Sequence, residues 1–527
     1  MSSDELTTIA QKAARGGLFL FIGNTSSTVI LAIGSIIVAR LLGPSSYGLY
    51  TLAIVIPTIL ISLSDAGMNY ALVRLPARLR AAGDRARASR LIRLGFLLKL
   101  AISIVAFIIC YFGSARIATT ILNRPELVPF LQLASLMILF QAIYDAANNS
   151  FIGQDLMQYS AGIQIMQAIL KGTLGPALVL IGLGIRGALS GYVLALAAAG
   201  LTGATVLLTR YARFSRQTSD SVSMELRELL GYGLPLYLAS IVSVFFAQYQ
   251  NIVLAHFASN VEIGNFGATW NFNTFMTILT YPITTAMFPM FSKMDPKSQK
   301  SDLARGLVLS VKYSSLLMIP ASIGVMVFSR NLIYLTYGSS YAFAPQYLEL
   351  LSVLYLLTVI GSVVLGSFLY GVADTRTIIM MSVLTLAVYL PLGALLAWLW
   401  GPYGVIVAYI LSNAVATVYG IRQTSVRFDA RPDLKVSGRI LLAALVAAIP
   451  TVGLIQLDGA GVGVVNLIVG GLLYLAVYLT LAPILGAVNK QDILNLRGLL
   501  GGTRIVEKLL NPALDYEAKL LSAMRKD

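Results

Sequence analysis

The chain has 527 residues, of which 57% are hydrophobic and only 12% are charged, and its mean hydropathy is +0.79. So much apolar surface cannot be buried in a soluble globular domain, and the composition therefore indicates a polytopic membrane protein. The net charge of +15 does not indicate a nucleic-acid partner, because the basic residues lie between apolar segments, where the bias of Lys and Arg toward cytoplasmic loops accounts for them.

Apolar segments long enough to cross a bilayer recur along the whole chain. A helix crosses the hydrocarbon region in about 20 residues, so the sequence predicts an all-α fold with about 14 transmembrane helices. The predicted spans are Gly17–Ala39, Gly48–Asn69, Leu91–Phe112, Val128–Ala146, Ala161–Leu183, Gly187–Leu208, Leu230–Ala255, Ile263–Phe288, Leu307–Phe328, Tyr347–Leu369, Thr377–Leu399, Tyr403–Ile421, Ile440–Ile455 and Val462–Ile484.

The first two predicted spans are separated by a very short break, Leu42-Gly43-Pro44-Ser45-Ser46. Glycine and proline are turn residues, and the two serines mark a point where the backbone can be hydrated before it returns to the hydrocarbon. The sequence therefore predicts a tight turn between two membrane-length helices.

The chain also contains an internal repeat. The segment VARLLG at 38–43 aligns with LAHFAS at 254–259, which places Gly48 over Gly264. Further along, GIRG at 184–187 aligns with GPYG at 401–404, and Gly153 aligns with Gly371. Each copy holds six spans, an even number, so both copies enter the membrane from the same side and are predicted to form two parallel-related six-helix lobes.

This repeat divides the chain into four predicted parts. The two lobes cover residues 1–212 and 213–425, two additional transmembrane helices cover 426–487, and a tail covers 488–527. The tail mixes apolar and charged residues and is too polar to span a membrane, so we expect interfacial helices on the cytoplasmic leaflet.

The distribution of Lys and Arg predicts the orientation. Links after even-numbered spans carry Arg74, Arg78, Arg80, Arg85, Arg87, Arg90, Arg210, Arg213, Arg216, Lys293, Lys297, Lys300, Arg305, Arg422, Arg427, Arg431 and Lys435, whereas links after odd-numbered spans hold Arg116, Arg124, Arg186 and Arg330. Since cytoplasmic loops are enriched in basic residues, we expect a multi-pass protein of the plasma membrane with both termini in the cytoplasm.

Several of these segments together resemble a known family. They are ARLLGPSSYGLY at 39–50, SDAGM at 64–68, ALVR at 71–74 and GIRGALSGY at 184–192, in the setting of the duplicated six-helix plan. In these features the chain resembles the polysaccharide-lipid flippases (Wzx-like polysaccharide biosynthesis transporters) of the multidrug/oligosaccharidyl-lipid/polysaccharide exporter superfamily. The resemblance covers essentially the whole chain.

The resemblance implies a V-shaped pair of lobes around a central cavity. Such a protein works by alternating access and moves undecaprenyl- or dolichol-linked sugars to the outer leaflet. The family has an arginine at the end of the first span, where this sequence has Arg40, and the counterpart in the second copy is His256.

Polar residues inside the predicted spans are the candidate site residues, because polar and charged groups are costly in hydrocarbon. The second span contains Asp65, the fourth contains Asp145, and the fifth carries a stripe formed by Ser160, Gln164, Gln167 and Lys171. In the second copy the candidates for the substrate cavity are Gln250, Asn251, Trp270 and Asn273. Packing between helices is the alternative role for the uncharged members of these sets.

The charged candidates have alternatives as well. Asp65 and Asp145 are candidates for the cavity and for ion coupling, or else are hydrated carboxylates near the cytoplasmic ends of their spans. Lys171, near mid-membrane, is expected to project into the cavity, to contact water or a carboxylate such as Asp145, and to attract the phosphate of a lipid carrier. His256 is a coupling candidate or an interfacial residue, and Lys99 and Lys312 are expected to extend to the membrane surface.

Three functional hypotheses follow. The first is a flippase for lipid-linked saccharide, the second a drug or metabolite exporter of the same superfamily, and the third an enzyme or accessory subunit of a glycan assembly complex. We expect that the chain is not an enzyme. The sequence has no Gly-x-x-x-x-Gly-Lys-Ser/Thr loop for ATP phosphates, no metal-ligand spacing, and a single cysteine, Cys110. We expect no cofactor or metal, a coupling ion that is either H⁺ or Na⁺, and glycosyltransferases or a polymerase of the same pathway as partners.

Overall fold

The computed structural model describes residues 3–211, 222–295, 298–457, 463–500 and 504–524, and every regular element among them is helical. The predicted boundary between residues 212 and 213 lies outside the described residues, as do Arg213, Arg216, Lys297 and Val462. Two compact units, Met1–Gly267 and Ala268–Asp527, make up the chain, and their boundary falls within one helix.

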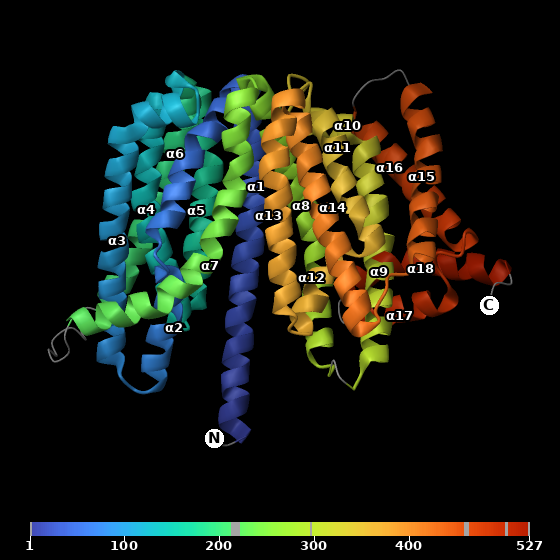
Figure 1. Cartoon of the computed structure of the whole chain (residues 1–527), viewed down its shortest axis with the longest axis horizontal. Coiled ribbons are helices and arrows are strands. Elements are labelled where there is room, and N and C mark those ends of the chain that lie inside the picture. The colour runs from blue at the N-terminus through green and yellow to red at the C-terminus, as the bar shows by residue number, and fades with distance from the viewer. Residues whose placement is uncertain (1–2, 212–221, 296–297, 458–462, 501–503, 525–527) are drawn as a thin grey trace. The chain divides into compact units, whose positions relative to one another are not determined.

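Figure 1 shows the helices of the described residues. The first unit contains α1 (Ser3–Ser64), α2 (Met68–Ala81), α3 (Arg85–Arg116), α4 (Val128–Gly153), α5 (Met157–Leu178), α6 (Gly184–Tyr211) and α7 (Val222–Phe257), with short π or 3₁₀ turns at Ile117–Ile121, Pro125–Leu127 and Val179–Leu183. Helix α8 (Asn260–Ser292) passes from the first unit into the second. The second unit continues with α9 (Lys300–Val327), α10 (Ser329–Thr336), α11 (Ala344–Leu356), a 3₁₀ turn η5 (Leu357–Ile360), α12 (Ser362–Gly371), α13 (Thr375–Trp400), α14 (Pro402–Phe428), α15 (Leu434–Leu457), α16 (Val464–Ile484), α17 (Lys490–Leu500) and α18 (Arg504–Ala523).

Nine helical segments of the described residues are long and apolar enough to cross a membrane, or ten if the bent pair Ala344–Ile360 and Ser362–Gly371 counts as one span. Two of the nine are far longer than one crossing requires: Arg15–Ala81 has 67 residues and Met157–Thr209 has 53. The chain is therefore an all-helical, multi-pass membrane protein.

Helix α1 folds back on itself at Gly43. The backbone of Gly43 has φ 72° and ψ 167°, which a residue with a side chain rarely adopts. The hydroxyls of Ser35 and Tyr47 are 3.2 Å apart, although a straight helix would separate these residues by about 18 Å along its axis. The two arms of α1 therefore lie side by side, and the predicted tight turn between the first two spans is confirmed.

The repeat seen in the sequence is accompanied by repeated backbone conformations. Gly184 has φ 52° and ψ −132°, and Gly401, which aligns with it, has φ 57° and ψ −133°. Asp155 and Ala373 each lie two residues after the aligned glycines Gly153 and Gly371, and their φ angles are 57° and 58°. Positive φ is uncommon outside glycine, so the same strained turn begins the helix that follows in both copies.

Charged residues attach the start of α7 to the hairpin formed by α2 and α3. The carboxylate of Glu228 accepts hydrogen bonds from Arg78 and from Arg87, the latter at 3.0 Å. Glu225 is buried and lies 3.3 Å from the guanidinium of Arg90. The arginines of the predicted cytoplasmic link are thus neutralised in part by the acidic first turns of α7.

The two C-terminal helices of the second unit belong to its core. Leu514 and Leu521 of α18 and Ile493 of α17 are buried in one hydrophobic cluster with Tyr474 and Tyr478 of α16. Apolar residues on one face of α18 are thus covered by protein. The predicted location of this tail on the cytoplasmic leaflet stays a prediction.

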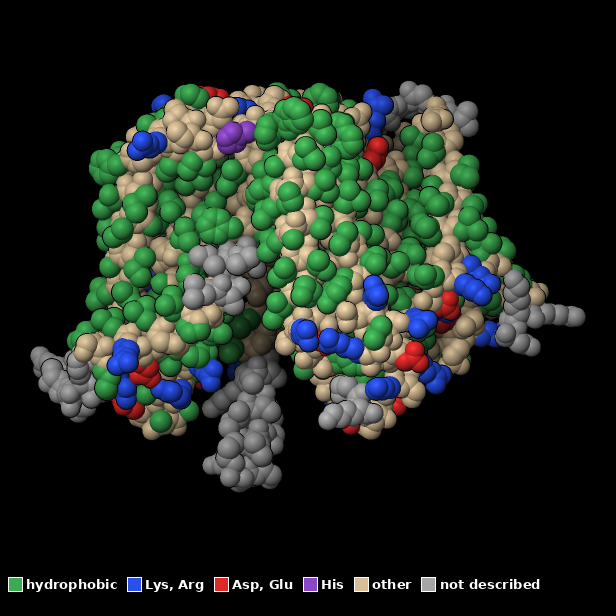
Figure 2. All heavy atoms as spheres, in the orientation of Figure 1, with side chains coloured by type: hydrophobic (Ala, Val, Ile, Leu, Met, Phe, Trp, Pro, Cys, Tyr) green, Lys and Arg blue, Asp and Glu red, His purple; other side chains and the backbone are tan. Residues whose placement is uncertain are grey.

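The surface of each unit has the pattern expected of a membrane protein. On the face shown in Figure 2, hydrophobic side chains cover the central zone, and most Lys, Arg, Asp and Glu side chains lie toward the ends of the helices. Many large apolar side chains are exposed, among them Phe112 at 77%, Ile181 at 72% and Trp398 at 67%. Exposure of such a surface is favourable in the hydrocarbon of a bilayer and unfavourable in water.

Candidate functional site

A break between α1 and α2 positions the first carboxylate. Helix α1 ends at Ser64, and the chain turns through Ala66 and Gly67 with φ 46° and 80° before α2 begins. The Asp65 backbone carbonyl accepts a hydrogen bond from the Met68 amide at 2.8 Å. Gly67 is required here, because a Cβ at that position would overlap the backbone of Gly233 in α7. The turn therefore holds Asp65 in the interior of the first unit.

Lys99 of α3 lies at the centre of the polar interior of the first unit. Its Nζ donates hydrogen bonds to Asp65 Oδ1 at 2.8 Å and to Asn69 Oδ1 at 2.6 Å, and it lies 3.5 Å from Asp145 Oδ2 of α4. The side chain of Lys99 is 2% exposed, and those of Asp65 and Asp145 are 12% and 20% exposed. We call Lys99, Asp65 and Asp145 the charged cluster.

Two amides extend the charged cluster along α4. Gln141 donates to Asp145 Oδ1 at 2.8 Å, and Asn149 donates to Asn69 Oδ1 at 2.8 Å. The three α4 residues Gln141, Asp145 and Asn149 recur every four positions, so they lie on one helix face that meets α1, α2 and α3. Lys99 is therefore shared by both carboxylates, and Asp145 accepts a further hydrogen bond from Gln141.

The charged cluster has an excess of one negative charge when all three of its members are ionised. A buried pair of carboxylates with one ammonium between them favours the entry of a further positive charge. That charge can be a proton on a carboxylate or a monovalent cation. No group of three or more His, Cys, Asp or Glu side chains suited to a metal ion occurs among the residues that the structure describes.

The prediction that Lys99 extends to the membrane surface is wrong. Lys99 is one of the largest fully buried side chains of the described residues and is paired with Asp65 of the α1–α2 turn and Asp145 of α4. The sequence offered a signal that we did not use, since two intramembrane aspartates of one lobe need a counter-charge. Lys312 does not extend freely to water either, because its ammonium pairs with Asp492 of α17.

Lys171 has a different environment from the one predicted. It is half-buried on α5, and its Nζ lies 3.4 Å from the centre of the Tyr192 ring of α6. A cation over an aromatic face is stabilised by the ring quadrupole, so this lysine can stay charged without a carboxylate. Asp145, which was named as an example of a carboxylate partner in place of water, lies 3.5 Å from Lys99 Nζ. The projection of Lys171 into a cavity stays a prediction.

Gln164 and Gln167, which precede Lys171 on the same stripe of α5, are partly buried and buried, respectively. Gln164 donates to Asn148 Oδ1 of α4 at 3.2 Å and to Ser160 Oγ at 3.1 Å. Gln167 is buried, with 8% exposure. The contacts of Gln164 connect α5 to α4, which is the packing role that the sequence left open.

The remaining candidates of the first unit lie near the ends of their helices or within α7. Arg40 is exposed and lies one turn before the reversal at Gly43. His256 is exposed in the last turn of α7, with Nδ1 3.1 Å from the Ile252 carbonyl oxygen. Gln250 is buried, and Asn251 donates to Gln248 Oε1 at 3.2 Å.

The two candidates of the second unit lie on α8. Trp270 packs edge to face against Tyr409 of α14, with ring centres 5.3 Å apart. Asn273 accepts a hydrogen bond on Oδ1 from the Tyr355 hydroxyl of α11 at 2.5 Å. Both residues thus connect α8 to other helices of the second unit.

Comparison with known proteins gives consistent results. A family model described as polysaccharide biosynthesis protein matches residues 13–295. Over 508 residues the chain is 22% identical to Agl15, a probable low-salt glycan biosynthesis flippase of Haloferax volcanii, which covers 92% of this chain and 98% of that protein. It is 23% identical over 411 residues to the lipopolysaccharide biosynthesis protein WzxC of Escherichia coli, with 75% and 77% covered.

A solved structure shares the fold. The lipid II flippase MurJ in its inward closed conformation is similar with a TM-score of 0.69 at 13% identity, and the match covers 89% of this chain and 98% of that one. At this identity the likeness concerns the arrangement of helices.

Proposed function

Because this chain belongs to the polysaccharide biosynthesis protein family, we propose that it is a secondary transporter that flips lipid-linked saccharide from the cytoplasmic to the outer leaflet of the plasma membrane. It works by alternating access and is not an enzyme. Its partners are the lipid-linked saccharide and the bilayer, and glycosyltransferases or a polymerase of the same pathway make or consume the cargo. The nearly full-length similarity to a probable glycan flippase supports this proposal.

The observation that carries the proposal is the charged cluster inside the first unit. Three ionisable side chains from the α1–α2 turn, α3 and α4 meet there with little exposure. Ionisable groups within membrane helices mark transport pathways and coupling sites, since their burial is costly and a packing role would be served by apolar residues. We propose that Asp65 and Asp145 bind the coupling ion, H⁺ or Na⁺, and that Lys99 alternates between them.

The architecture that we propose has fourteen spans in two parallel-related six-helix lobes followed by two further helices. The reversal within α1, the two overlong segments, the bent α11–α12 pair and the lengths of α7 and α8, 36 and 33 residues, support this number. The matched conformations of Gly184 and Gly401 support the repeat.

We propose that both termini are cytoplasmic. Within the first unit, the start of α1 and the arginine-rich link between α2 and α3 lie at the same end of the bundle (Figure 1), which supports this orientation.

Lys171 is proposed as the group that attracts the diphosphate of the lipid carrier. Its half-buried ammonium is held over Tyr192 and has no carboxylate partner among the described residues. A cation held only by an aromatic ring can exchange this contact for the stronger one with a phosphate oxygen.

A genetic experiment tests the function. Deletion of the gene is expected to cause lipid-linked saccharide to accumulate on the cytoplasmic leaflet, and expression of the intact chain is expected to restore export. Accumulation of the bare lipid carrier, or of an unfinished saccharide, would indicate an enzyme of assembly instead. Unchanged saccharide with increased drug sensitivity would indicate a drug exporter.

A further inference from the structure

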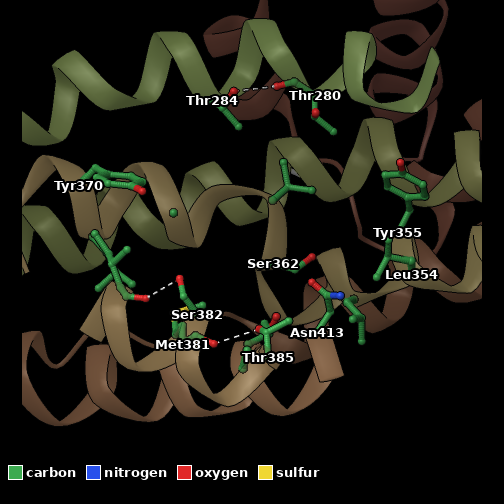
Figure 3. A pocket seen from close by; sticks show the side chains of 17 residues that line it. Thr280, Thr284, Leu354, Tyr355, Ser362, Tyr370, Met381, Ser382, Thr385 and Asn413 are labelled. Carbon is green, nitrogen blue, oxygen red and sulfur yellow. Dashed lines mark hydrogen bonds between the residues drawn. The ribbon is translucent and has the colours of Figure 1, made fainter. Parts of the chain in front are cut away.

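The second unit contains a cavity of about 420 Å³, within the range of about 300–1,000 Å³ that is usual for small-molecule sites. Its walls come from α8, α11, α12, α13 and α14 (Figure 3). Polar side chains on opposite walls face the same space, with Thr280 and Thr284 of α8 on one side and Ser382, Thr385 and Asn413 of α13 and α14 on the other.

A break between two helical segments lies in the wall of this cavity. Gly361 has φ 92°, and the helical axis bends by 50° between Ala344–Ile360 and Ser362–Gly371. Residues on both sides of the bend, including Tyr355 and Ser362, line the cavity. The bend in the cavity wall is therefore located at a backbone conformation that favours glycine.

Five polar side chains of the walls donate hydrogen bonds to main-chain carbonyl oxygens of their own helices. Thr280 donates to the Thr277 carbonyl oxygen at 2.9 Å, and Thr385 donates to that of Met381 at 2.9 Å. Thr284, Ser382 and Asn413 also donate to main-chain carbonyl oxygens of their own helices. These hydroxyls keep their lone pairs, and Asn413 keeps its carbonyl oxygen and a second N–H. The hydroxyls of Ser362, Tyr370 and Thr417 make no hydrogen bond within the described residues, so the walls offer both acceptors and donors.

This chemistry discriminates between the parts of a lipid-linked saccharide. No charged side chain occurs among the described residues that line the cavity, so a diphosphate would find no counter-charge there. A hydrocarbon tail would leave the hydroxyls of Ser362 and Thr417 without hydrogen-bond partners. Sugar hydroxyls, in contrast, supply several donors, and the rings of Tyr355 and Tyr370 offer apolar surface to the C–H faces of a pyranose.

We propose that this cavity is a binding subsite for a neutral sugar residue of the transported lipid-linked saccharide. The inference rests on the proposed function and concerns only the cavity of the second unit. Acceptors at Thr385 and Asn413 receive hydrogen bonds from sugar hydroxyls.

Two synthetic probes test this subsite on the full chain in lipid nanodiscs. One is a short-chain polyprenyl diphosphate carrying a single neutral sugar, and the other is the same lipid diphosphate without sugar. We expect the wild-type chain to bind the sugar-bearing probe more tightly. The double variant Thr385→Val and Asn413→Leu is expected to lower the affinity for the sugar-bearing probe about tenfold. Its affinity for the sugar-free probe is expected to equal that of the wild type.

Two further variants control for folding. Ser382→Ala removes one exposed hydroxyl of the wall, and it is expected to lower the affinity for the sugar-bearing probe by only about threefold. Thr209→Val, in the first unit, removes an exposed threonine that donates to its own helix in the same way, at 2.9 Å to the Thr205 carbonyl oxygen, and is expected to change neither probe.

The outcomes separate this inference from the proposed function. Equal binding of both probes by the wild-type chain, or equal weakening of both by the wall variants, would overturn the sugar subsite and leave the flippase function standing. Failure of the wild-type chain to bind either probe would overturn the proposed function and this inference with it.

Discussion

The carbonyl oxygen of Pro44 lies so close to Gly264 that a Cβ on that glycine would overlap it, and the Asn260 carbonyl oxygen lies in the same way against Gly48. Asn260 and Gly264 stand 216 residues after Pro44 and Gly48, in the second copy of the repeat. The two close approaches are therefore equivalent, since each sets a glycine of one segment against the carbonyl oxygen four residues before the aligned glycine of the other. The Gly43 reversal and the start of α8 meet at this contact within the first unit.

We predict that Gly48→Ala and Gly264→Ala each push α1 and α8 apart at this contact. In either variant the new methyl group meets a main-chain carbonyl oxygen, which cannot move aside as a flexible side chain could, and the expected loss of stability is about 1–3 kcal/mol. Thermal unfolding of the purified protein measures this loss. Gly162→Ala is the matched control, because a Cβ at Gly162 has no neighbour within 4 Å, and it is expected to be neutral or slightly stabilising. Unfolding of both glycine variants at the wild-type temperature would contradict the close approach of Gly48 to Asn260 and of Gly264 to Pro44.

Replacement of Lys99 by methionine is expected to destabilise the protein strongly. The variant keeps the volume of the side chain but leaves Asp65 and Asp145 buried without their cation, at a cost of about 3–5 kcal/mol. The triple variant Lys99→Met, Asp65→Asn and Asp145→Asn removes all three charges and is expected to recover most of that stability without recovering export. Scanning fluorimetry and an export assay give the two readouts.

The exposed lysine Lys300 supplies the control for this prediction, since Lys300→Met should change neither stability nor export. Export by the triple variant at the wild-type rate would show that the charged cluster has a structural role only.

At Lys171 the sign of the charge is expected to matter more than the shape of the side chain. Arginine can also stack on Tyr192, so Lys171→Arg should keep part of the export, whereas Lys171→Ala and Lys171→Glu should reach the membrane in normal amounts and fail to export saccharide. Tyr192→Phe retains the aromatic face and should behave like the wild type. Quantitative export with parallel immunoblots of the membrane fraction measures both quantities, and normal export by the alanine variant would remove Lys171 from the mechanism.

Glu517 on α18 is expected to make the docking of the tail depend on pH. Burial, together with the negative charge of Asp492, raises the pKa of Glu517 to about 7, and the residue lies between Leu514 and Leu521 on the buried side of the helix. A raised carboxyl pKa means that the folded state holds a proton which the unfolded state releases. Stability should therefore fall as the pH rises from about 4.5 to 7, by at most about 3 kcal/mol, and stay level above that range.

Limited proteolysis of α18 at pH 5 and pH 8 measures this dependence. Glu517→Gln imitates the protonated side chain, so it should keep α18 protected at both values. Asp515→Asn removes an exposed ion pair between α18 and Arg497 of α17, and since such pairs contribute little, it should leave the wild-type pH dependence in place. Equal protection of the wild type at both pH values would contradict the prediction.

The sequence alone determined the class of fold and the course of the helices. Length and hydrophobicity of the segments identify membrane helices because a bilayer requires about 20 apolar residues for each crossing. The reversal at Gly43 was predictable from Gly43-Pro44-Ser45-Ser46, since local backbone chemistry decides a turn. The break at Gly361 within one predicted span was not predicted, because a single glycine in an apolar helix is compatible with both a straight and a bent course.

The partners of the charged residues were decided by the tertiary structure. Spacing along one helix placed Gln141, Asp145 and Asn149 on a common face, but it gave no information about which helix lies opposite. Lys99 and Asp65 meet only because α3 and the α1–α2 turn pack together, and that contact reversed the expectation that Lys99 extends to the surface. Helical periodicity fixes the direction of a side chain around its own axis, whereas the neighbour that it meets depends on packing between helices far apart in the chain.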